Sequence, residues 1–152
     1  MASFVNAADA VAAAVEIERR GHAFYEKVES KATGEDKDFF AFMAKEELRH
    51  EGIFQAMLDR LGGVPLPAGS TDEEYLQYVK GLLDSHTLFM PEQEKRILEA
   101  PVYQALQFEK DTLIFFVELE TMVPDSEKKF VRQCADEERK HIRMLLKRFP
   151  KQ

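Results

Sequence analysis

The sequence predicts an all-α protein, a four-helix bundle made of two antiparallel helix pairs joined by a long crossover. Apolar residues recur at helical spacing over four long stretches of the chain. These stretches are 6–32, 36–61, 101–122 and 126–149. Short breaks separate the members of each pair, so the paired helices are expected to be antiparallel neighbours. The segment of about 62–100 separates the two pairs.

The ends of the first helix pair carry local signals. Asn6 is suited to an N-cap, and Asp9 lies in the first turn, where the helix dipole favours a carboxylate. The letters TGED at 33–36 interrupt the helical pattern, and the second helix is expected to begin near Asp36. The GG pair at 62–63 then ends the second helix.

The crossover is expected to contain one short helix. It begins with the turn-rich letters GGVPLPAGST, after which Thr71 and Glu74 make a capping-box pattern before the helical letters of 72–85. Pro101 is acceptable in the first turn of the third long helix, and VPDS at 123–126 separates the third helix from the fourth. A single long crossover between two helix pairs is the layout of ferritin-like bundles rather than of simple up-and-down bundles.

Length, composition and charge narrow the class of protein. The 152 residues suit a single domain spanning 1–152, and 45% hydrophobic with 32% charged residues is the composition of a folded protein. The net charge of −7 argues against a nucleic-acid or membrane partner. The single Cys excludes an internal disulfide. No signal peptide or membrane-spanning run is recognised, so a cytoplasmic location is expected.

A shift of 91 residues aligns the chain with itself without a gap. Residues 14–55 and 105–146 then share ten identities in 42 positions, where average composition would give about two or three. The two helix pairs therefore resemble duplicated halves related by a pseudo-twofold axis. Three of the identical pairs have side chains that commonly bind metals. They are Glu18/Glu109, Glu47/Glu138 and His50/His141.

These six residues have the chemistry of a dimetal site. A Glu and a His three residues apart project from one face of a helix, as in EELRH at 46–50 and EERKH at 137–141. Glu18 and Glu109 each lie within an apolar stripe, where an unpaired carboxylate is costly. Four carboxylates and two imidazoles would neutralise two divalent ions and give each a mixed oxygen and nitrogen shell, suited to Fe, Mn or Zn.

The alternative interpretation is two solvated helix faces with incidental histidines. A lone Glu-x-x-His in a chain this rich in Glu would be weak evidence for a metal. The alternative leaves unexplained why Glu18 and Glu109 lie in apolar stripes in the same ungapped register. We therefore favour the dimetal site.

Four segments resemble the helices of the rubrerythrins. The letters EIERRGHAFYEKV and MAKEELRHEGIF are similar to the first two helices of that family. ALQFEKDTLIFFVEL and CADEERKHIRMLL are similar to the last two. The resemblance covers nearly the whole chain and implies a ferritin-like bundle that holds two iron ions.

The resemblance also implies a role for each candidate ligand. In such sites two carboxylates bridge the metals, and here they would be Glu47 and Glu138. Each metal would further take one terminal carboxylate and one histidine. These ligands are Glu18, Glu109, His50 and His141. Tyr25 would hydrogen-bond toward one of the carboxylates from outside the ligand set.

Two features depart from the typical rubrerythrin pattern. Typical members carry a rubredoxin-like domain with four Cys on one iron, whereas this sequence has one Cys, so a form without that domain is expected. Typical members also carry a further Glu one turn after the ligand of the third helix, which binds in one redox state. Thr112 occupies that position, and its partner in the repeat is Gly21. Without this Glu, the resemblance does not predict efficient peroxide reduction by the family mechanism.

Three other residues near the motifs have competing interpretations. His22 lies four residues after Glu18 and could join the metal site, although a position at the edge of the core is favoured. His86, in the crossover, is expected on the surface. Cys134 is expected to be a small core residue.

Four acidic residues beside the motifs could support the ligands or lie in solvent. Glu46 and Glu137 point about 100° away from the adjacent ligand candidates, so they are expected on solvated faces. Asp111 and Asp136 could orient the ligand histidines, although a surface position is favoured.

Three functions share this ligand set. The first is a redox enzyme that reduces peroxide or O₂ with electrons from an external donor, a rubredoxin-like protein or a flavoprotein. The second is a ferroxidase or iron-binding protein, and the third is a non-enzymatic metal-binding protein, for example of zinc. Iron is the expected metal in the first two. A homodimer is expected because twelve Phe are generous for one bundle.

Overall fold

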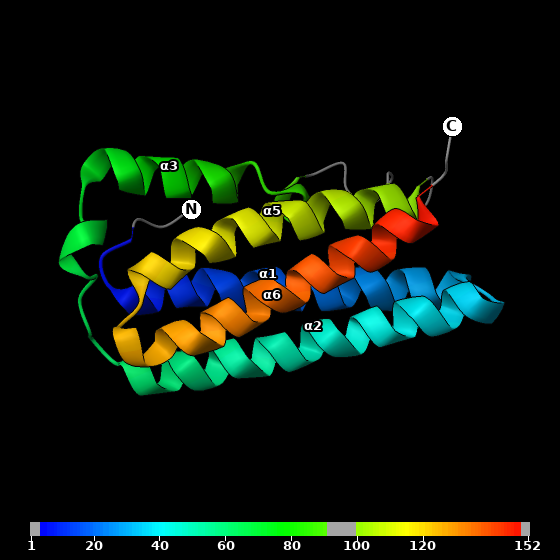
Figure 1. The fold of residues 1–152 in the computed structure, drawn as a ribbon, viewed down its shortest axis with the longest axis horizontal. Coiled ribbons are helices and arrows are strands. Elements are labelled where there is room, and N and C mark those ends of the chain that lie inside the picture. The colour runs from blue at the N-terminus through cyan, green and yellow to red at the C-terminus, as the bar shows by residue number, and fades with distance from the viewer. Residues whose placement is uncertain (1–3, 91–99, 150–152) are drawn as a thin grey trace.

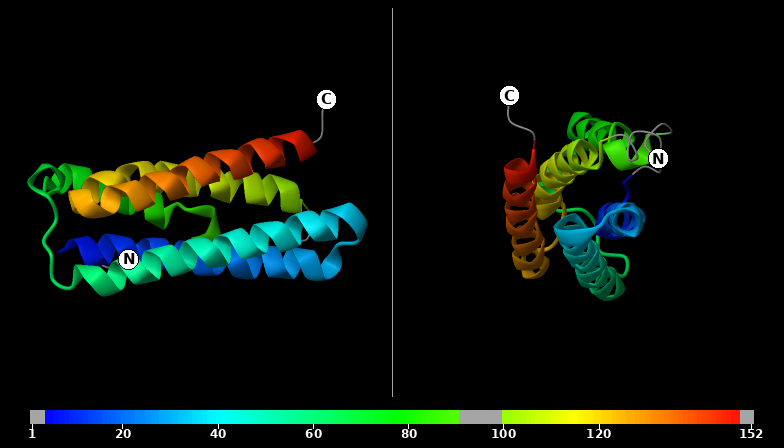
Figure 2. Two further views of the ribbon diagram at one scale, coloured as in Figure 1. Left: turned by 60° about the horizontal axis from the view of Figure 1, so that its bottom comes forward. Right: turned by 90° about the vertical axis from the view of Figure 1, so that its right-hand side faces the viewer.

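The computed structural model describes residues 4–90 and 100–149, and its long helices form the expected bundle (Figure 1). In chain order these helices are α1 (Ala7–Lys31), α2 (Gly34–Leu61), α5 (Pro101–Met122) and α6 (Asp125–Arg148). The described residues contain no strand, which confirms the all-α class. α1 pairs with α2 and α5 with α6, and the two pairs face one another across the core (Figure 2).

The helix ends lie close to the sequence signals. Asn6 Oδ1 accepts a hydrogen bond from the Asp9 N–H at 3.0 Å, and the Asp9 carboxylate accepts from the Asn6 N–H, which completes a capping box. α2 begins two residues before the expected position, at Gly34, whose φ of 60° suits glycine. Gly62, with φ of 55°, ends α2 as predicted.

The crossover packs along α5. It contains the 3₁₀ turn η1 (Ala68–Ser70), the helix α3 (Glu73–Asp84) and the 3₁₀ turn η2 (Thr87–Phe89). The expected capping box of Thr71 was wrong by one residue, because Asp72 is the N-cap and accepts from the Tyr75 N–H at 3.0 Å. The part of the predicted crossover at 91–99 lies outside the described residues.

Two polar contacts fix the crossover to α5. The Tyr75 hydroxyl donates to Glu118 Oε1 at 3.0 Å, and the Ser70 hydroxyl donates to the Thr121 carbonyl at 2.6 Å. η2 then turns toward the middle of the bundle, because the Thr87 N–H donates to Asp111 Oδ2 at 2.9 Å. The crossover therefore reaches the central turns of α5.

Three buried aromatic side chains of α1 and α5 pack against one another. Phe24 packs edge-on against Phe108 with ring centroids 4.8 Å apart, and Tyr25 lies 5.2 Å from both rings. All three are buried. Edge-to-face pairs of this kind contribute about 0.5–1.5 kcal/mol each beyond the area they bury. The rings form a rigid layer beside the polar residues described below.

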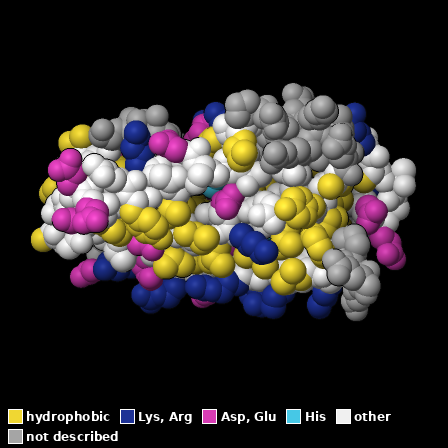
Figure 3. All heavy atoms as spheres, turned by 90° about the horizontal axis from the view of Figure 1, so that it is seen from above, with side chains coloured by type: hydrophobic (Ala, Val, Ile, Leu, Met, Phe, Trp, Pro, Cys, Tyr) yellow, Lys and Arg dark blue, Asp and Glu magenta, His cyan; other side chains and the backbone are white. Residues whose placement is uncertain are grey.

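The outer surface mixes charges with apolar patches. Figure 3 shows hydrophobic side chains on the face that carries α3 and α5, with Lys and Arg gathered along one edge. Tyr103, Ile114 and Val117 of α5 are among the exposed large hydrophobic residues. The expected homodimer stays a prediction. None of the helices in the described part of the chain is long and apolar enough to cross a membrane.

The capping box of α1 should be measurable as stability. Asn6→Ala removes the side-chain acceptor of the Asp9 N–H and should lower the free energy of unfolding by about 1 kcal/mol. Thr33→Ala is the matched control, because Thr33 is the N-cap of α2 but makes no capping bond. Urea unfolding of both variants tests this, and equal losses would contradict the capping role.

Candidate metal centre

The six residues singled out in the sequence meet in the middle of the bundle. Glu47 and His50 extend from one face of α2, and Glu138 and His141 from the equivalent face of α6. Glu18 of α1 and Glu109 of α5 face them from the other two helices. All six side chains are buried, none being more than 2% exposed. The apolar stripes of α1 and α5 therefore do carry buried carboxylates.

The six residues form two overlapping groups of potential ligands. One group is Glu18, Glu47, His50 and Glu138, and the other is Glu47, Glu109, Glu138 and His141. Within each group the ligand atoms lie within 4.8 Å of one another. Glu47 and Glu138 belong to both groups. Two carboxylates shared between two groups, each completed by one Glu and one His, is the arrangement that a carboxylate-bridged metal pair requires.

Both histidines turn the same nitrogen toward the carboxylates. His50 Nδ1 lies 3.0 Å from Glu138 Oε1 and 3.6 Å from Glu18 Oε1. His141 Nδ1 lies 3.5 Å from Glu109 Oε2 and 3.6 Å from Glu138 Oε2. The two rings stack at a centroid distance of 5.8 Å with an angle of 22° between their planes. Each half thus presents an imidazole nitrogen to the same central space.

Several buried polar atoms at this centre lack a hydrogen-bond partner in the part of the chain that the structure describes. They are both carboxylate oxygens of Glu18, Oε2 of Glu109, Oε2 of Glu138 and Nδ1 of His141. Buried polar atoms are rarely left unsatisfied in native proteins, because each costs about 1–3 kcal/mol. Metal ions bound between these atoms would satisfy all of them, so the residues present fit a pair of divalent cations.

The carboxylates oppose one another's ionisation. Burial, together with the charges of Glu109, Glu18 and Glu138, raises the pKa of Glu47 well above its ordinary value. Burial and the neighbouring Glu138 raise the pKa of Glu109 to about 8. Burial likewise raises the pKa of Glu18. With protons as the only cations, part of this cluster is therefore neutral at pH 7.

The histidines compensate for some of this charge. Although burial lowers the pKa of His50, the hydrogen bond to Glu138 and the nearby carboxylate of Glu18 raise it to about 12 overall. His141 follows the same pattern with Glu109 and Glu138, and its pKa is raised to about 11. Burial would raise the pKa of Glu138, but the nearby Glu109, His141 and His50 lower it. The cluster holds exchangeable protons where metal ions would bind.

Two residues of α1 shape the carboxylates from outside. The Tyr25 hydroxyl donates to Glu109 Oε1 at 2.9 Å, which is the hydrogen bond that the family resemblance implied. Gly21 leaves room for Glu47, because a Cβ at position 21 would lie 3.2 Å from Glu47 Cδ and 3.4 Å from Oε2. The glycine therefore permits the close approach of α1 to the shared carboxylate.

The expectation that Glu46 and Glu137 lie on solvated faces was wrong. Their side chains are only 19–20% exposed. Glu137 Oε1 lies 3.3 Å from His50 Nε2, and Glu46 Oε1 lies 3.5 Å from His141 Nε2. A residue 100° around the helix from an inward ligand points into the seam between two close helices rather than into water.

Asp111 and Asp136 do not support the ligand histidines. Asp111 accepts from the backbone and hydroxyl of Thr87, and Asp136 accepts from Arg139 Nη1 at 2.7 Å on the exposed face of α6. Asp136 lies on the surface as favoured, Asp111 is half-buried beside Thr87, and Glu46 and Glu137 are the carboxylates that contact the histidines. Glu46 and Glu137 occupy equivalent positions in the two halves, 91 residues apart, and this repeat was the signal that could have identified them.

His86 was expected on the surface but is fully buried. Its Nδ1 accepts from the Leu88 N–H at 3.1 Å, so its Nε2 carries the proton and donates to the Thr112 hydroxyl at 2.9 Å. Burial lowers the pKa of His86 to about 4, which keeps the ring neutral. The crossover therefore covers Thr112, where the family pattern has a Glu. The apolar letters TLFM after His86 were a signal for burial.

His22 and Cys134 do not join the two ligand groups. His22 Nδ1 contacts the Ala44 carbonyl at 2.8 Å, and Nε2 lies 3.2 Å from Glu26 at the edge of the bundle. Cys134 is buried as predicted, and burial raises the pKa of its thiol to about 12. Its sulfur lies near His50 and Glu137, within 4.8 Å of a ligand atom of each, as a protonated packing group.

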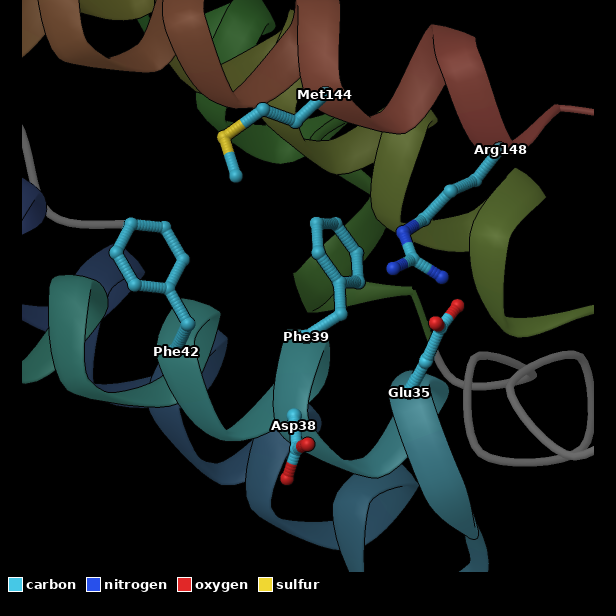
Figure 4. Close-up of a pocket in the computed structure, with 6 residues that line it drawn as sticks. All are labelled: Glu35, Asp38, Phe39, Phe42, Met144 and Arg148. Carbon is cyan, nitrogen blue, oxygen red and sulfur yellow. The ribbon is translucent and has the colours of Figure 1, made fainter.

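A surface pocket adjoins one side of the centre (Figure 4). It lies between the start of α2 and the end of α6, with Phe39, Phe42 and Met144 projecting into it and Arg148 at its edge. The Phe42 ring stands edge-on to His141 with centroids 6.4 Å apart. Phe42 therefore separates the pocket from the ligand histidine.

Enlarging Gly21 should disturb the centre without weakening the helix. Gly21→Ala places a methyl group against the Glu47 carboxylate and should weaken divalent metal binding by about tenfold, the scale of effect for displaced ligand support. Gly52→Ala is the control, because nothing lies within 4 Å of its added Cβ. It should raise stability by about 0.5–1 kcal/mol and leave metal affinity unchanged. Calorimetric titration with Co²⁺ measures both, and unchanged affinity in Gly21→Ala would contradict the crowding.

The raised pKa of Glu109 predicts a pH dependence of stability. Because its pKa is about 8 in the folded protein against an ordinary value of 4.5, its contribution to stability is complete below pH 4.5 and is lost as pH rises through 8. Relative to Glu109→Gln, the metal-free protein should therefore lose stability between about pH 5 and 8. Urea unfolding in the presence of a chelator measures this, and parallel pH profiles would contradict it.

Comparisons with known proteins agree with this geometry. A family model described as Rubrerythrin matches residues 9–149. A crystal structure of a Thermotoga maritima protein, described as ferritin-like and diiron-carboxylate, aligns with a TM-score of 0.71 and 24% sequence identity. The alignment covers 97% of this chain and 96% of that chain, which shows a shared fold. No curated protein sequence matches the chain. Because the family model spans nearly all of the sequence, the chain belongs to the rubrerythrin family.

Proposed function

We propose that this protein holds two iron ions and reduces peroxide or O₂ with electrons from an external donor. The observation that carries the proposal is the group of unpartnered atoms on Glu18, Glu109, Glu138 and His141, all buried and directed at one centre. A bundle stabilised only by packing would gain nothing from this arrangement, because each unpaired buried group costs free energy. The arrangement becomes favourable when two cations occupy it.

The six residues would have different roles in binding the two metals. Glu47 and Glu138, which belong to both ligand groups, would be shared by the two ions. Glu18 and His50 would complete the ligands of one ion, and Glu109 and His141 those of the other. Two iron ions together supply the two electrons that convert H₂O₂ and two protons into two molecules of water.

Other residues keep the centre ordered and dry. The Tyr25 phenol remains protonated, because burial and the charge of Glu109 raise its pKa well above 10. Its hydroxyl therefore donates to Glu109 at every physiological pH and fixes one terminal carboxylate. The six ligands are all buried, so access of bulk water is restricted. A dry site of this kind strengthens each charge interaction within it.

The electron donor is proposed to be a separate protein. The 152 residues contain one Cys, which is buried and protonated, so they cannot form a four-Cys iron centre. A small rubredoxin-like protein or a flavoprotein would provide the electrons.

The second candidate function is iron oxidation without an organic substrate. It is favoured by Thr112 and Gly21, because neither can supply the extra carboxylate that the family pattern uses when the site changes redox state. His86 does not replace that carboxylate, since its ring is neutral and its Nε2 proton is engaged with Thr112. In this case Fe²⁺ is the substrate and O₂ the oxidant.

Kinetics of the Fe²⁺-loaded protein separate the candidates. Stopped-flow mixing with H₂O₂ should give oxidation that is at least tenfold faster than mixing with the same concentration of O₂, an order-of-magnitude criterion equal to about 1.4 kcal/mol of barrier. Rapid oxidation by O₂ that an external electron donor does not reverse would instead favour the ferroxidase. Absence of oxidation by both would overturn each redox function.

A double variant that removes both shared carboxylates tests the site assignment. Glu47→Ala combined with Glu138→Ala should bind no metal pair and show no fast oxidation, whereas Glu120→Ala, on the exterior beside Arg132, should behave as the parent. Metal analysis after anaerobic loading should give about two ions per chain for the parent, the stoichiometry of a two-metal site. Retention of two ions by the double variant would overturn the site assignment.

A further inference from the structure

The ligand histidines are held at both ends of their rings. Their Nδ1 atoms face the buried carboxylates, and their Nε2 atoms face the seam between α2 and α6. There His50 Nε2 lies 3.3 Å from Glu137 Oε1, and His141 Nε2 lies 3.5 Å from Glu46 Oε1. Each histidine is therefore met by a carboxylate from the opposite helix.

One arginine connects the two carboxylates. Arg49 Nε and Nη2 donate to the two oxygens of Glu46 at 3.1 and 3.0 Å, and Nη2 also donates to Glu137 Oε2. The planar guanidinium can hold both carboxylates because its donors form a rigid fork. Glu46, Arg49 and Glu137 are called the carboxylate clamp below.

The two carboxylates of the clamp occupy equivalent positions in the two halves, but its arginine has no equivalent arginine in the second half. Glu46 and Glu137 are separated by the same 91 residues as the ligand pairs. Arg49 is replaced in the second half by Lys140, whose single ammonium cannot form the same fork. One guanidinium thus serves both halves. Because the clamp crosses from α2 to α6, it joins two helices from different halves beside the two ligand histidines.

This geometry fixes which nitrogen of each histidine is available. When a cation displaces the Nδ1 proton, the Nε2–H that faces a carboxylate keeps the remaining proton, and the lone pair lies on Nδ1, the atom directed at the ligand groups. A carboxylate acceptor also makes the imidazole a stronger electron donor to a bound cation. We propose that the clamp positions both histidines for metal binding, and that each half of the chain thereby orients the ligand of the other half.

The inference rests on the proposed dimetal function, and its test can fail separately. Glu46→Gln and Glu137→Gln keep the shape of the side chain and remove its charge. Asp136→Asn is the matched control: it removes the same charge next to Glu137 but at a side chain that is 61% exposed and, within the residues that the structure describes, pairs only with Arg139. Arg49→Gln removes the fork while leaving both carboxylates. Circular dichroism should show that all four variants remain folded.

Co²⁺ titration followed by proton NMR provides the readout. In the parent, the Co²⁺ form should show two exchangeable, strongly shifted ring N–H signals, one for each histidine. Glu137→Gln should displace one signal and Glu46→Gln the other, and each should weaken Co²⁺ binding by about 10–100-fold, the scale for lost outer-shell support. Arg49→Gln should displace both signals. A role in folding alone would not move the two signals separately.

The midpoint potential of the iron-loaded protein is the second readout. The two Gln variants should raise it, because a less electron-rich imidazole favours Fe²⁺ over Fe³⁺. Potentials and Co²⁺ affinities equal to those of Asp136→Asn would overturn the clamp. Failure of the parent itself to bind Co²⁺ would instead overturn the proposed function.

Discussion

The burial of four carboxylates in the middle of an apolar bundle is the constraint on which the rest of the structure depends. Each ionised carboxylate would cost several kcal/mol in this environment without a compensating cation. Protons offset part of the charge, as the raised pKa values of Glu47 and Glu109 indicate. Two divalent cations would offset all of it, and water has little access because the six side chains are at most 2% exposed.

Because the chain is duplicated, each half contributes two of the four buried carboxylates. Differences at three equivalent positions make the two halves unequal. Tyr25 corresponds to Phe116, so Glu109 has a hydroxyl donor while neither oxygen of Glu18 has a partner in the described chain. Gly21 corresponds to Thr112, which allows Glu47 to approach α1 closely. The third is the exchange of Arg49 for a lysine described above. The Glu18 side of the centre is therefore less braced than the Glu109 side, and two metals bound there would differ in environment although their ligands are the same in kind.

The fold and the meeting of the six candidate ligands could be predicted from the sequence. The residues that surround these ligands could not. Helical spacing, a property of single helices, placed each Glu and His pair on one face, and the ungapped register of the two halves predicted that these faces meet. The position of Glu46 depends instead on how closely α2 approaches α6, and that of His86 on how the crossover folds back. Such distances arise from packing between distant segments, which spacing along one helix does not encode. The cap at Asp72 rather than Thr71 is a smaller case of the same limit.

The neutral pair of His86 and Thr112 has a consequence for the charge of the centre. Four carboxylates balance two divalent ions completely, whereas two trivalent ions leave two positive charges uncompensated in a dry site. A fifth carboxylate at position 112 would reduce that excess, but Thr112 is neutral, and His86 stays neutral because burial lowers its pKa to about 4. Glu46 and Glu137 carry charge nearby, yet Arg49 already balances one of them. In the proposed iron pair, the residues of this chain would therefore favour the reduced form, and the oxidised pair would readily accept electrons from the proposed donor.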